Sequence, residues 1–246
     1  MANGILYVAF GTAFRDEALL SIASLRSQMP EIPVCLLTDE MPKDVPFGGV
    51  DIQLIQPEHV RAKVDFLTST PFDKTIYLDS DTLVELPLGE MFDLLDKFDV
   101  LGTHDWARKR KSLSRKIEAY GQIPYGFSEI NGGVLAWKKN RDTDRWLRLW
   151  KELYYRYQSP GGRDQATLRL SLWESGVRLY ILPVEFNVRS REGRAHVRRQ
   201  RKKMGNNHLR PRIIHAHAFK SIHAGKSPPS NFWLWRLIMR LRADYP

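Results

Sequence analysis

The amino-acid sequence predicts an α/β fold in which a mixed, mostly parallel sheet lies between helices. Short apolar runs alternate with segments of helical periodicity along most of the chain. The runs are almost continuously apolar, which is typical of strands that are covered on both faces of a sheet. Hydrophobic residues make up 43% of the 246 residues, so the chain can bury a large core and its composition argues against global disorder.

The individual elements follow from periodicity and from turn residues. We expect strands, in chain order, at residues 4–10, 33–39, 50–56, 74–79, 98–105, 132–139, 177–182 and 212–217. We expect helices at residues 13–29, 58–69, 141–157 and 163–175. The basic segment 191–212 is the candidate for a long irregular loop. Together these elements indicate one domain over residues 1–229, followed by a helical extension over residues 230–246.

The positive charge of the chain is concentrated in two runs. The formal net charge is +10, and residues 191–212 alone hold seven arginines and two lysines against one glutamate. The second basic run spans residues 108–116. Such charge suits nucleic acid, anionic lipid or a phosphorylated small molecule. Few aromatic residues accompany it, so no base-stacking platform is indicated, and two solvated loops are an equally good interpretation.

The single cysteine and the hydropathy pattern favour a cytoplasmic location. Cys35 lies in an apolar run and is expected to be a buried, inert thiol; alone it excludes an intrachain disulfide and a cysteine-rich metal site. No run approaches the ~18 uninterrupted apolar residues of a membrane span. The first apolar stretch is short and has no basic residue before it, which argues against a signal peptide.

The strand expected at residues 74–79 ends at two carboxylates, Asp79 and Asp81, in the stretch FDKTIYLDSDTLV. Residues i and i+2 of an extended chain point to the same side, so the two carboxylates converge. Carboxylates that close repel each other, and a divalent cation removes the conflict. Oxygen ligands select hard ions such as Mg²⁺ or Mn²⁺, which keep positions open for diphosphate oxygens. The alternative is an ordinary polar turn.

A second Asp-x-Asp pair, Asp142 and Asp144, needs no metal. It introduces the helix expected at residues 141–157, where capping and the helix dipole explain acidic residues. The first pair differs because it follows a buried strand and precedes the apolar pair Leu83-Val84. We therefore expect a metal at the first pair only.

Five blocks of the sequence resemble those of the GT-A glycosyltransferases, and more narrowly of carbohydrate-active family 8, the glycogenin and lipopolysaccharide galactosyltransferase type. The blocks are FDKTIYLDSDTLV, INGGVLAW, RDQATL, LPVEFNV and IIHAHAFKS, in the family's order. With the first strand, the resemblance runs from about residue 5 to residue 221. It implies a GT-A-like fold and transfer of a sugar from a UDP-sugar to an acceptor hydroxyl, with retention.

The resemblance also implies a metal site. Asp79 and Asp81 would bind Mn²⁺ or Mg²⁺, and a late histidine would complete the set. His215 is the first choice, and His217, which faces the same way on a strand, is the alternative. A neutral imidazole beside carboxylates is a reasonable Mn²⁺ ligand.

Two lysines would contact the donor by the same resemblance. Lys63 occupies the place of a basic donor-binding residue, and Lys220 that of the closing lysine, which grips the diphosphate. The sequence departs from the family's His-x-x-Gly-x-x-Lys-Pro, because no glycine lies between His215 and Lys220 and the spacing is one residue shorter. The stretch HAGKSP at residues 223–228 offers a second histidine, glycine and lysine.

The sugar would lie beside two further pairs of residues. Asn131 and Gly132 would border it, and Asp164 and Gln165 would lie by the anomeric carbon as candidates for catalysis. A Gly-Gly turn explains Gly132 nearly as well, and helix capping is an alternative for Asp164.

Phe10, Gly11 and Phe14 resemble the uridine-side positions of the family, with Phe14 where the family often has a stacking tyrosine. A role in the core is the stronger interpretation for Phe10.

The expected partners are a nucleotide-sugar donor and a glycan, lipid-linked or protein acceptor. Residues 230–246 would form either an interfacial helix on an anionic membrane or a helix docked on the domain. Three other functions remain open: a nucleotidyltransferase, a basic nucleic-acid-binding protein and a sugar-nucleotide binder without turnover. A nucleotidyltransferase would need a glycine-rich basic loop after the first strand, and the sequence shows no such loop there.

Overall fold

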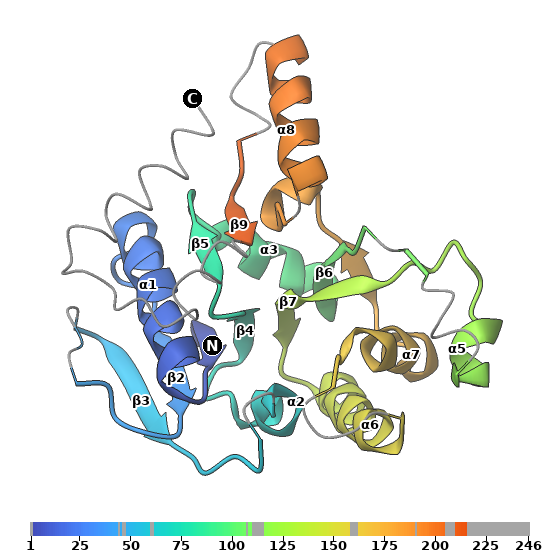
Figure 1. Cartoon of the computed structure of the whole chain (residues 1–246), viewed down its shortest axis with the longest axis horizontal. Coiled ribbons are helices and arrows are strands. Elements are labelled where there is room, and N and C mark those ends of the chain that lie inside the picture. Colours follow the sequence, from blue (N-terminus) through green and yellow to red (C-terminus); the bar gives the residue numbers. More distant parts are fainter. Residues whose placement is uncertain are drawn as a thin grey trace.

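A computed structural model of the chain describes residues 2–43, 45, 48–59, 62–106, 108–109, 116–157, 162–189, 191–204 and 210–215. The central sheet contains β1 (Asn3–Val8), β2 (Val34–Thr38), β3 (Val50–Leu54), β4 (Lys74–Leu78), β6 (Val100–His104), β7 (Ile130–Lys138) and β8 (Leu179–Ile181). Their order across the sheet is β3-β2-β1-β4-β7-β6-β8 (Figure 1). A small second sheet pairs β5 (Thr82–Val84) with β9 (Ile213–His215).

The sheet is mixed and mostly parallel, as predicted. The pairs β1/β2, β2/β3, β1/β4 and β6/β8 are parallel, and β7 runs antiparallel to both β4 and β6. The carboxyl ends of β4 and β6 therefore meet the beginning of β7 at one edge of the sheet. Sites in such sheets lie beyond the carboxyl ends of the strands.

Helices cover both faces of the sheet, which explains its continuously apolar strands. They are α1 (Thr12–Gln28), α2 (Lys63–Phe66), α3 (Gly89–Lys97), α5 (Glu118–Gln122), α6 (Arg141–Tyr157), α7 (Gln165–Ser175) and α8 (Arg191–Met204), with short 3₁₀ turns η1 (Leu67–Ser69) and η2 (Val184–Phe186). In β4, Ile76 and Leu78 join the core beneath α1 and α3, whereas Tyr77 joins the core beneath α6 and α7. Successive side chains point to opposite faces, so both must be apolar.

Most predicted elements form, with two differences. The helix at residues 141–157 has the expected bounds, whereas residues 58–69 form only α2 and η1. The prediction of an irregular loop over residues 191–212 is wrong for residues 191–204, which form α8. Arginine, lysine and glutamine are good helix formers, and the buried Val197 holds this helix against the domain.

Other predictions have mixed outcomes. Cys35 is fully buried, as expected. Within the part of the chain that the structure describes, no helix combines the length and the apolar character needed to cross a membrane. The extension predicted over residues 230–246 lies outside the described residues.

One buried carboxylate, Asp99, ties the far edge of the sheet together. It accepts bonds from Nε and Nη2 of Arg178, at 2.9 and 3.0 Å, and its Oδ1 lies 3.2 Å from Nζ of Lys138. The bonds from Arg178 are the main cause that lowers the pKa of Asp99 below its ordinary value, against the opposing effect of burial. The ion pairs therefore stabilise the fold above the ordinary aspartate pKa of about 4, and this stabilisation is lost in acid.

We expect Asp99→Asn to lower the free energy of unfolding by about 2 kcal/mol at neutral pH. The difference from wild type should shrink progressively as the pH falls below about 4, because the unfolded wild type then takes up a proton on Asp99 that the folded protein, with its lowered pKa, does not. Urea unfolding of both proteins at a series of pH values measures this difference in the free energy of unfolding. Asp144→Asn, which removes an exposed helix ion pair with Arg148, is the control and should change little. A pH-independent effect of Asp99→Asn would contradict the assignment.

Candidate metal and donor site

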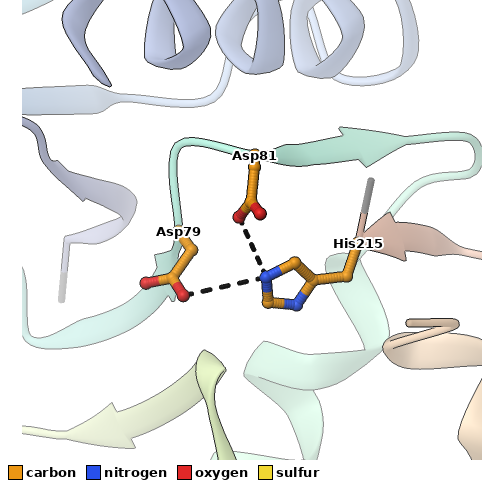
Figure 2. A group of neighbouring side chains, drawn as sticks. All are labelled: Asp79, Asp81 and His215. Atoms are coloured by element: carbon orange, nitrogen blue, oxygen red, sulfur yellow. Dashed lines mark ion pairs between the residues drawn. The ribbon is translucent and has the colours of Figure 1, made fainter. Parts of the chain in front are cut away.

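The predicted metal ligands are brought together by the two sheets. Asp79 follows β4 directly, and its N–H donates to the carbonyl of Gly133 at 2.8 Å. In the small sheet, antiparallel β5 and β9 set Thr82 opposite His215, which places the histidine beside Asp81. Figure 2 shows the three side chains pointing at one another. The third candidate ligand, His215, therefore comes from a segment far along the chain from the two aspartates.

The geometry of this cluster fits a small divalent cation. Nε2 of His215 lies 2.9 Å from Oδ1 of Asp81 and 3.8 Å from Oδ2 of Asp79. One ligand atom from each residue lies within 4.8 Å of the others. Metal–ligand bonds of about 2.1 Å place neighbouring ligand atoms roughly 3 Å apart, so only small side-chain shifts are needed. Two carboxylates and an imidazole suit Mn²⁺ or Mg²⁺.

A chain of amide hydrogen bonds fixes which ring nitrogen of His215 faces the carboxylates. The N–H of Gly133 donates to Oδ1 of Asn131 at 3.0 Å, so this atom must be the amide oxygen. Asn187 therefore presents its Nδ2 to the same oxygen at 2.9 Å and its Oδ1 to Nδ1 of His215 at 3.0 Å. Nδ1 must then carry a proton. In the neutral ring, the lone pair lies on Nε2 and faces Asp79 and Asp81, which is the arrangement of a metal ligand.

Gly133 is needed for the close approach of these groups. A Cβ atom at this position would overlap Cε1 of His215 and lie 2.6 Å from Oδ2 of Asp79. At the neighbouring Gly132 an added Cβ would lie 3.4 Å from the nearest atom, which is ordinary contact. The second glycine of the pair thus leaves room for the candidate metal ligands, whereas the first has room for a methyl group.

Lys63 connects the metal site with Asp164. Its Nζ lies 3.1 Å from Oδ1 of Asp79 and 2.9 Å from Oδ2 of Asp164, and it donates to the carbonyl of Gly132 at 2.9 Å. Burial alone would lower the pKa of Lys63, but the carboxylates of Asp164 and Asp79 outweigh it and raise that pKa above its ordinary value. A permanently charged ammonium therefore lies beside the metal site.

Tyr77 orients the first aspartate through its hydroxyl group. Its hydroxyl donates to Oδ1 of Asp79 at 2.6 Å. Burial, and then the charge of Asp79, raise the pKa of Tyr77 well above its ordinary value, so the phenol keeps its proton. Because Tyr77 and Asp79 are two residues apart, they lie on the same side of the strand.

A second polar cluster surrounds Asp105, at the carboxyl end of β6. Its Oδ2 accepts bonds from Nε2 of Gln165 at 2.6 Å and Nδ2 of Asn131 at 3.3 Å, and pairs with Nη1 of Arg189 at 2.7 Å. Asn131 thus belongs to both clusters. Its amide, expected at the sugar, is buried and bonded to protein groups at both ends.

Asp164, Phe10 and Phe14 are further candidates, and for the first two the sequence left a structural role open. Asp164 is the residue before α7, but its carboxylate makes no capping hydrogen bond and lies against Lys63 instead, so the capping interpretation is wrong. Phe10 is buried and packs edge-to-face on Phe66 at 5.3 Å, which is a role in the core. Phe14 packs partly exposed against the core.

Gly11 lies in a turn that only glycine adopts readily. Its φ of 81° and ψ of 149° fall outside the regions open to other residues, and its N–H donates to the carboxylate of Asp39. His217 and Lys220, the remaining candidates, lie outside the described residues.

Solved structures resemble this one over most of the chain. A galactosyltransferase, LgtC, in complex with donor and acceptor sugar analogs matches with a TM-score of 0.64 at 15% identity, over 94% of this chain and 99% of its own. Mouse xyloside xylosyltransferase 1 matches with a TM-score of 0.59 at 12% identity, over 88% and 98%. WbbM, a bifunctional glycosyltransferase, matches with 0.63 at 12% identity, over 96% of this chain and 51% of its own. The chain has the GT-A glycosyltransferase fold.

Sequence comparisons add nothing to this assignment. No protein-family model matches the sequence, and no curated protein matches it significantly. At such low identities the structural likeness establishes the GT-A fold alone, so the chemistry must be argued from the side chains.

Four residues of this GT-A site were missed by sequence reasoning. They are Tyr77, Asp105, Gly133 and Asn187. Asp105 had a usable signal, because it ends a predicted strand as Asp79 does. The roles of Gly133 and Asn187 depend on contacts with His215, for which the sequence offers no signal.

Proposed function

We propose that the protein is a metal-dependent glycosyltransferase that moves a sugar from a UDP-sugar to an acceptor hydroxyl with retention. The observation that carries the proposal is that ligand atoms of Asp79, Asp81 and His215 lie within 4.8 Å of one another, with Nδ1 of His215 turned to Asn187 and Nε2 turned to the carboxylates. A cation between two carboxylates so placed relieves their mutual repulsion. The likeness to LgtC, solved with donor and acceptor sugar analogs, supports a nucleotide-sugar donor.

The donor diphosphate would lie between the metal ligands and Lys63. A divalent cation held by Asp79, Asp81 and His215 supplies Lewis-acid stabilisation of the departing diphosphate. Lys63 is already charged, and in the bound state it exchanges part of its carboxylate contact for a phosphate oxygen. Tyr77 and Asn187 keep Asp79 and His215 oriented, so little reorganisation accompanies binding.

The sugar itself would lie toward Asp164 and Gln165. Asp164 and Asp79 both pair with Nζ of Lys63, and Gln165 donates to Asp105. Carboxylate and amide groups held in this way would bind sugar hydroxyls. Attack by the acceptor hydroxyl from the face that the diphosphate leaves gives retention.

Calorimetry and product analysis test the proposal. Titration with Mn²⁺ or Mg²⁺ in the presence of UDP should show saturable uptake of the ion, and titration with UDP should be tighter with the ion than without it. A panel of UDP-sugars should then show metal-dependent donor hydrolysis, and NMR of a transferred product should show the donor's anomeric configuration.

The rival functions predict different outcomes. Uptake of the ion and UDP without turnover of any sugar in the panel favours a non-catalytic binder. No uptake of either ion, with or without UDP, overturns the proposal.

A further inference from the structure

Helix α1 turns a polar face toward the segment that carries the acidic pair. Glu17, Ser21 and Ser24 follow one another at spacings of four and three residues, so they share one face of the helix, here called the polar face of α1. These residues are only 4%, 0% and 6% exposed. A helix usually buries apolar side chains against the core, so three buried polar side chains in one row require partners.

The first two of these side chains bind the turn between β4 and β5. The hydroxyl of Ser80 donates to Oε2 of Glu17 at 2.9 Å, and Oγ of Ser21 lies 2.9 Å from Oγ1 of Thr82. Ser80 is the residue between the two aspartates of the proposed metal site. A bond to its side chain therefore acts on the backbone of both carboxylates.

The third side chain, Ser24, binds the strand that follows this turn. Helix α1 lies beside β5 (Figure 1), and in the described part of the chain β5 pairs with one strand only, β9. The N–H of Val84 in β5 donates to Oγ of Ser24 at 2.9 Å, and the Ser24 hydroxyl donates to the carbonyl of Ser21 at 2.6 Å. The helix thus satisfies a backbone group that a further strand would otherwise bind.

A row of buried hydroxyl groups fixes the direction of these bonds. The hydroxyl of Thr82 donates to the carbonyl of Asp79 at 2.8 Å, so it has no second proton to offer. The hydroxyl of Ser21 must then donate to Thr82, and that of Tyr7, 2.9 Å away, must donate to Ser21. Burial raises the pKa of Tyr7, so the phenol keeps its proton. The row runs from β1 through α1 to the backbone of the first candidate metal ligand.

We propose that the polar face of α1 positions the acidic pair of the proposed metal site. Two carboxylates this close repel each other until an ion binds, and the repulsion acts to open the turn that joins them. The bonds from α1 hold that turn and the strand after it in place. The pair therefore faces His215 before the ion arrives, and little reorganisation accompanies binding. The effect on metal binding rests on the proposed function, whereas the placement of the carboxylates does not.

Two substitutions of Glu17 in the full-length protein separate its hydrogen bond from its charge. Glu17→Met removes the acceptor of the Ser80 hydroxyl, and Mn²⁺ binding in the presence of UDP should weaken by about tenfold, as is usual when a residue that supports a metal ligand is lost. Glu17→Gln loses the same charge but keeps an oxygen that can accept the bond, so its Mn²⁺ affinity should stay within about threefold of wild type. Calorimetric titration measures both affinities.

A matched pair of buried serines separates positioning from general stability. Ser21→Ala and Ser171→Ala each remove a helix hydroxyl that is fully buried. Ser171 lies in α7 and accepts a bond from Nε1 of Trp146 in α6 at 3.1 Å. Both variants should lower the melting temperature by a similar amount, about 3 °C. Ser21→Ala alone should also weaken Mn²⁺ binding in the presence of UDP, by about tenfold.

Metal-free crystal structures of the two Glu17 variants test the placement of the carboxylates independently of the proposed function. The distance between Oδ1 of Asp81 and Nε2 of His215 should stay near 2.9 Å in Glu17→Gln. It should lengthen by more than about 0.5 Å in Glu17→Met.

Three results would overturn the inference: the same Asp81–His215 distance in both Glu17 variants, equal Mn²⁺ affinities in these variants, or equal losses of Mn²⁺ affinity in the two serine variants. Absence of Mn²⁺ uptake by the wild type would refute the proposed function instead, and the two crystal structures would then decide the inference.

Discussion

Conversion of Asp79 and Asp81 together to asparagine is expected to abolish sugar transfer and to weaken Mn²⁺ binding in the presence of UDP by about a thousandfold. Two anionic ligands become neutral, and the attraction to the ion falls by about 4 kcal/mol. His215 keeps its orientation, because its bond to Asn187 is untouched. Calorimetric titration of wild type and variant with Mn²⁺ and UDP measures the loss.

The same variant should remain folded. Asparagine keeps an oxygen that can accept the bonds from Lys63 and Tyr77, and Lys63 keeps its ion pair with Asp164, so circular dichroism of the metal-free protein should be unchanged. The wild type alone should gain stability when Mn²⁺ and UDP are added. The matched control changes the second pair, Asp142→Asn with Asp144→Asn, which lies in the exposed first turn of α6. This control should keep activity and the metal-induced stabilisation. Wild-type transfer by the first variant would refute the metal scheme.

Replacement of Gly133 by alanine is also expected to weaken Mn²⁺ binding, although it removes no metal ligand. The added methyl group occupies the space of His215 and Asp79, so one of these side chains must move away from the metal position. Displacement of a ligand by even 1 Å is costly at such sites, and we expect Mn²⁺ affinity to fall by about a hundredfold. Metal titration in the presence of UDP measures the change.

The neighbouring glycine supplies the control. Gly132→Ala places its methyl group in ordinary contact with Leu168, so metal affinity should stay within about threefold of wild type. An added methyl beside Lys63 and Asp164 can still impair sugar turnover, and for this reason the comparison uses metal binding. Equal metal affinities in the two alanine variants would contradict the geometry.

Local patterns in the sequence were sufficient for much of the site. The acidic pair follows an apolar strand, and this placement alone distinguishes Asp79 and Asp81 from Asp142 and Asp144. In the structure the second pair lies in the first turn of α6, where Asp144 forms an exposed ion pair with Arg148. The capping amide of that helix is Asn140, one residue before it, whose Oδ1 accepts the N–H of Thr143 at 2.9 Å.

Other parts of the site could not be foreseen. Asn131, which is expected at the sugar, also bridges Asn187, Gly133 and Asp105, and no sequence signal indicated these contacts. A buried amide satisfies whichever donors and acceptors the tertiary packing brings near it, and these come from distant segments. The basic segment 191–212 was expected to be an irregular loop, but residues 191–204 form α8.

The sequence by itself determined the alternation of strands and helices, the two apolar faces of the sheet and the position of the acidic pair at the end of β4. These features are local, because side-chain periodicity and strand termination depend on neighbouring residues. Only the tertiary structure decided that β9 pairs with β5, so that His215 meets Asp81, and that Gly133 leaves room for both metal ligands. Such contacts join segments far apart in the chain, and the pairing register of the strands, which no local pattern encodes, sets which atoms meet.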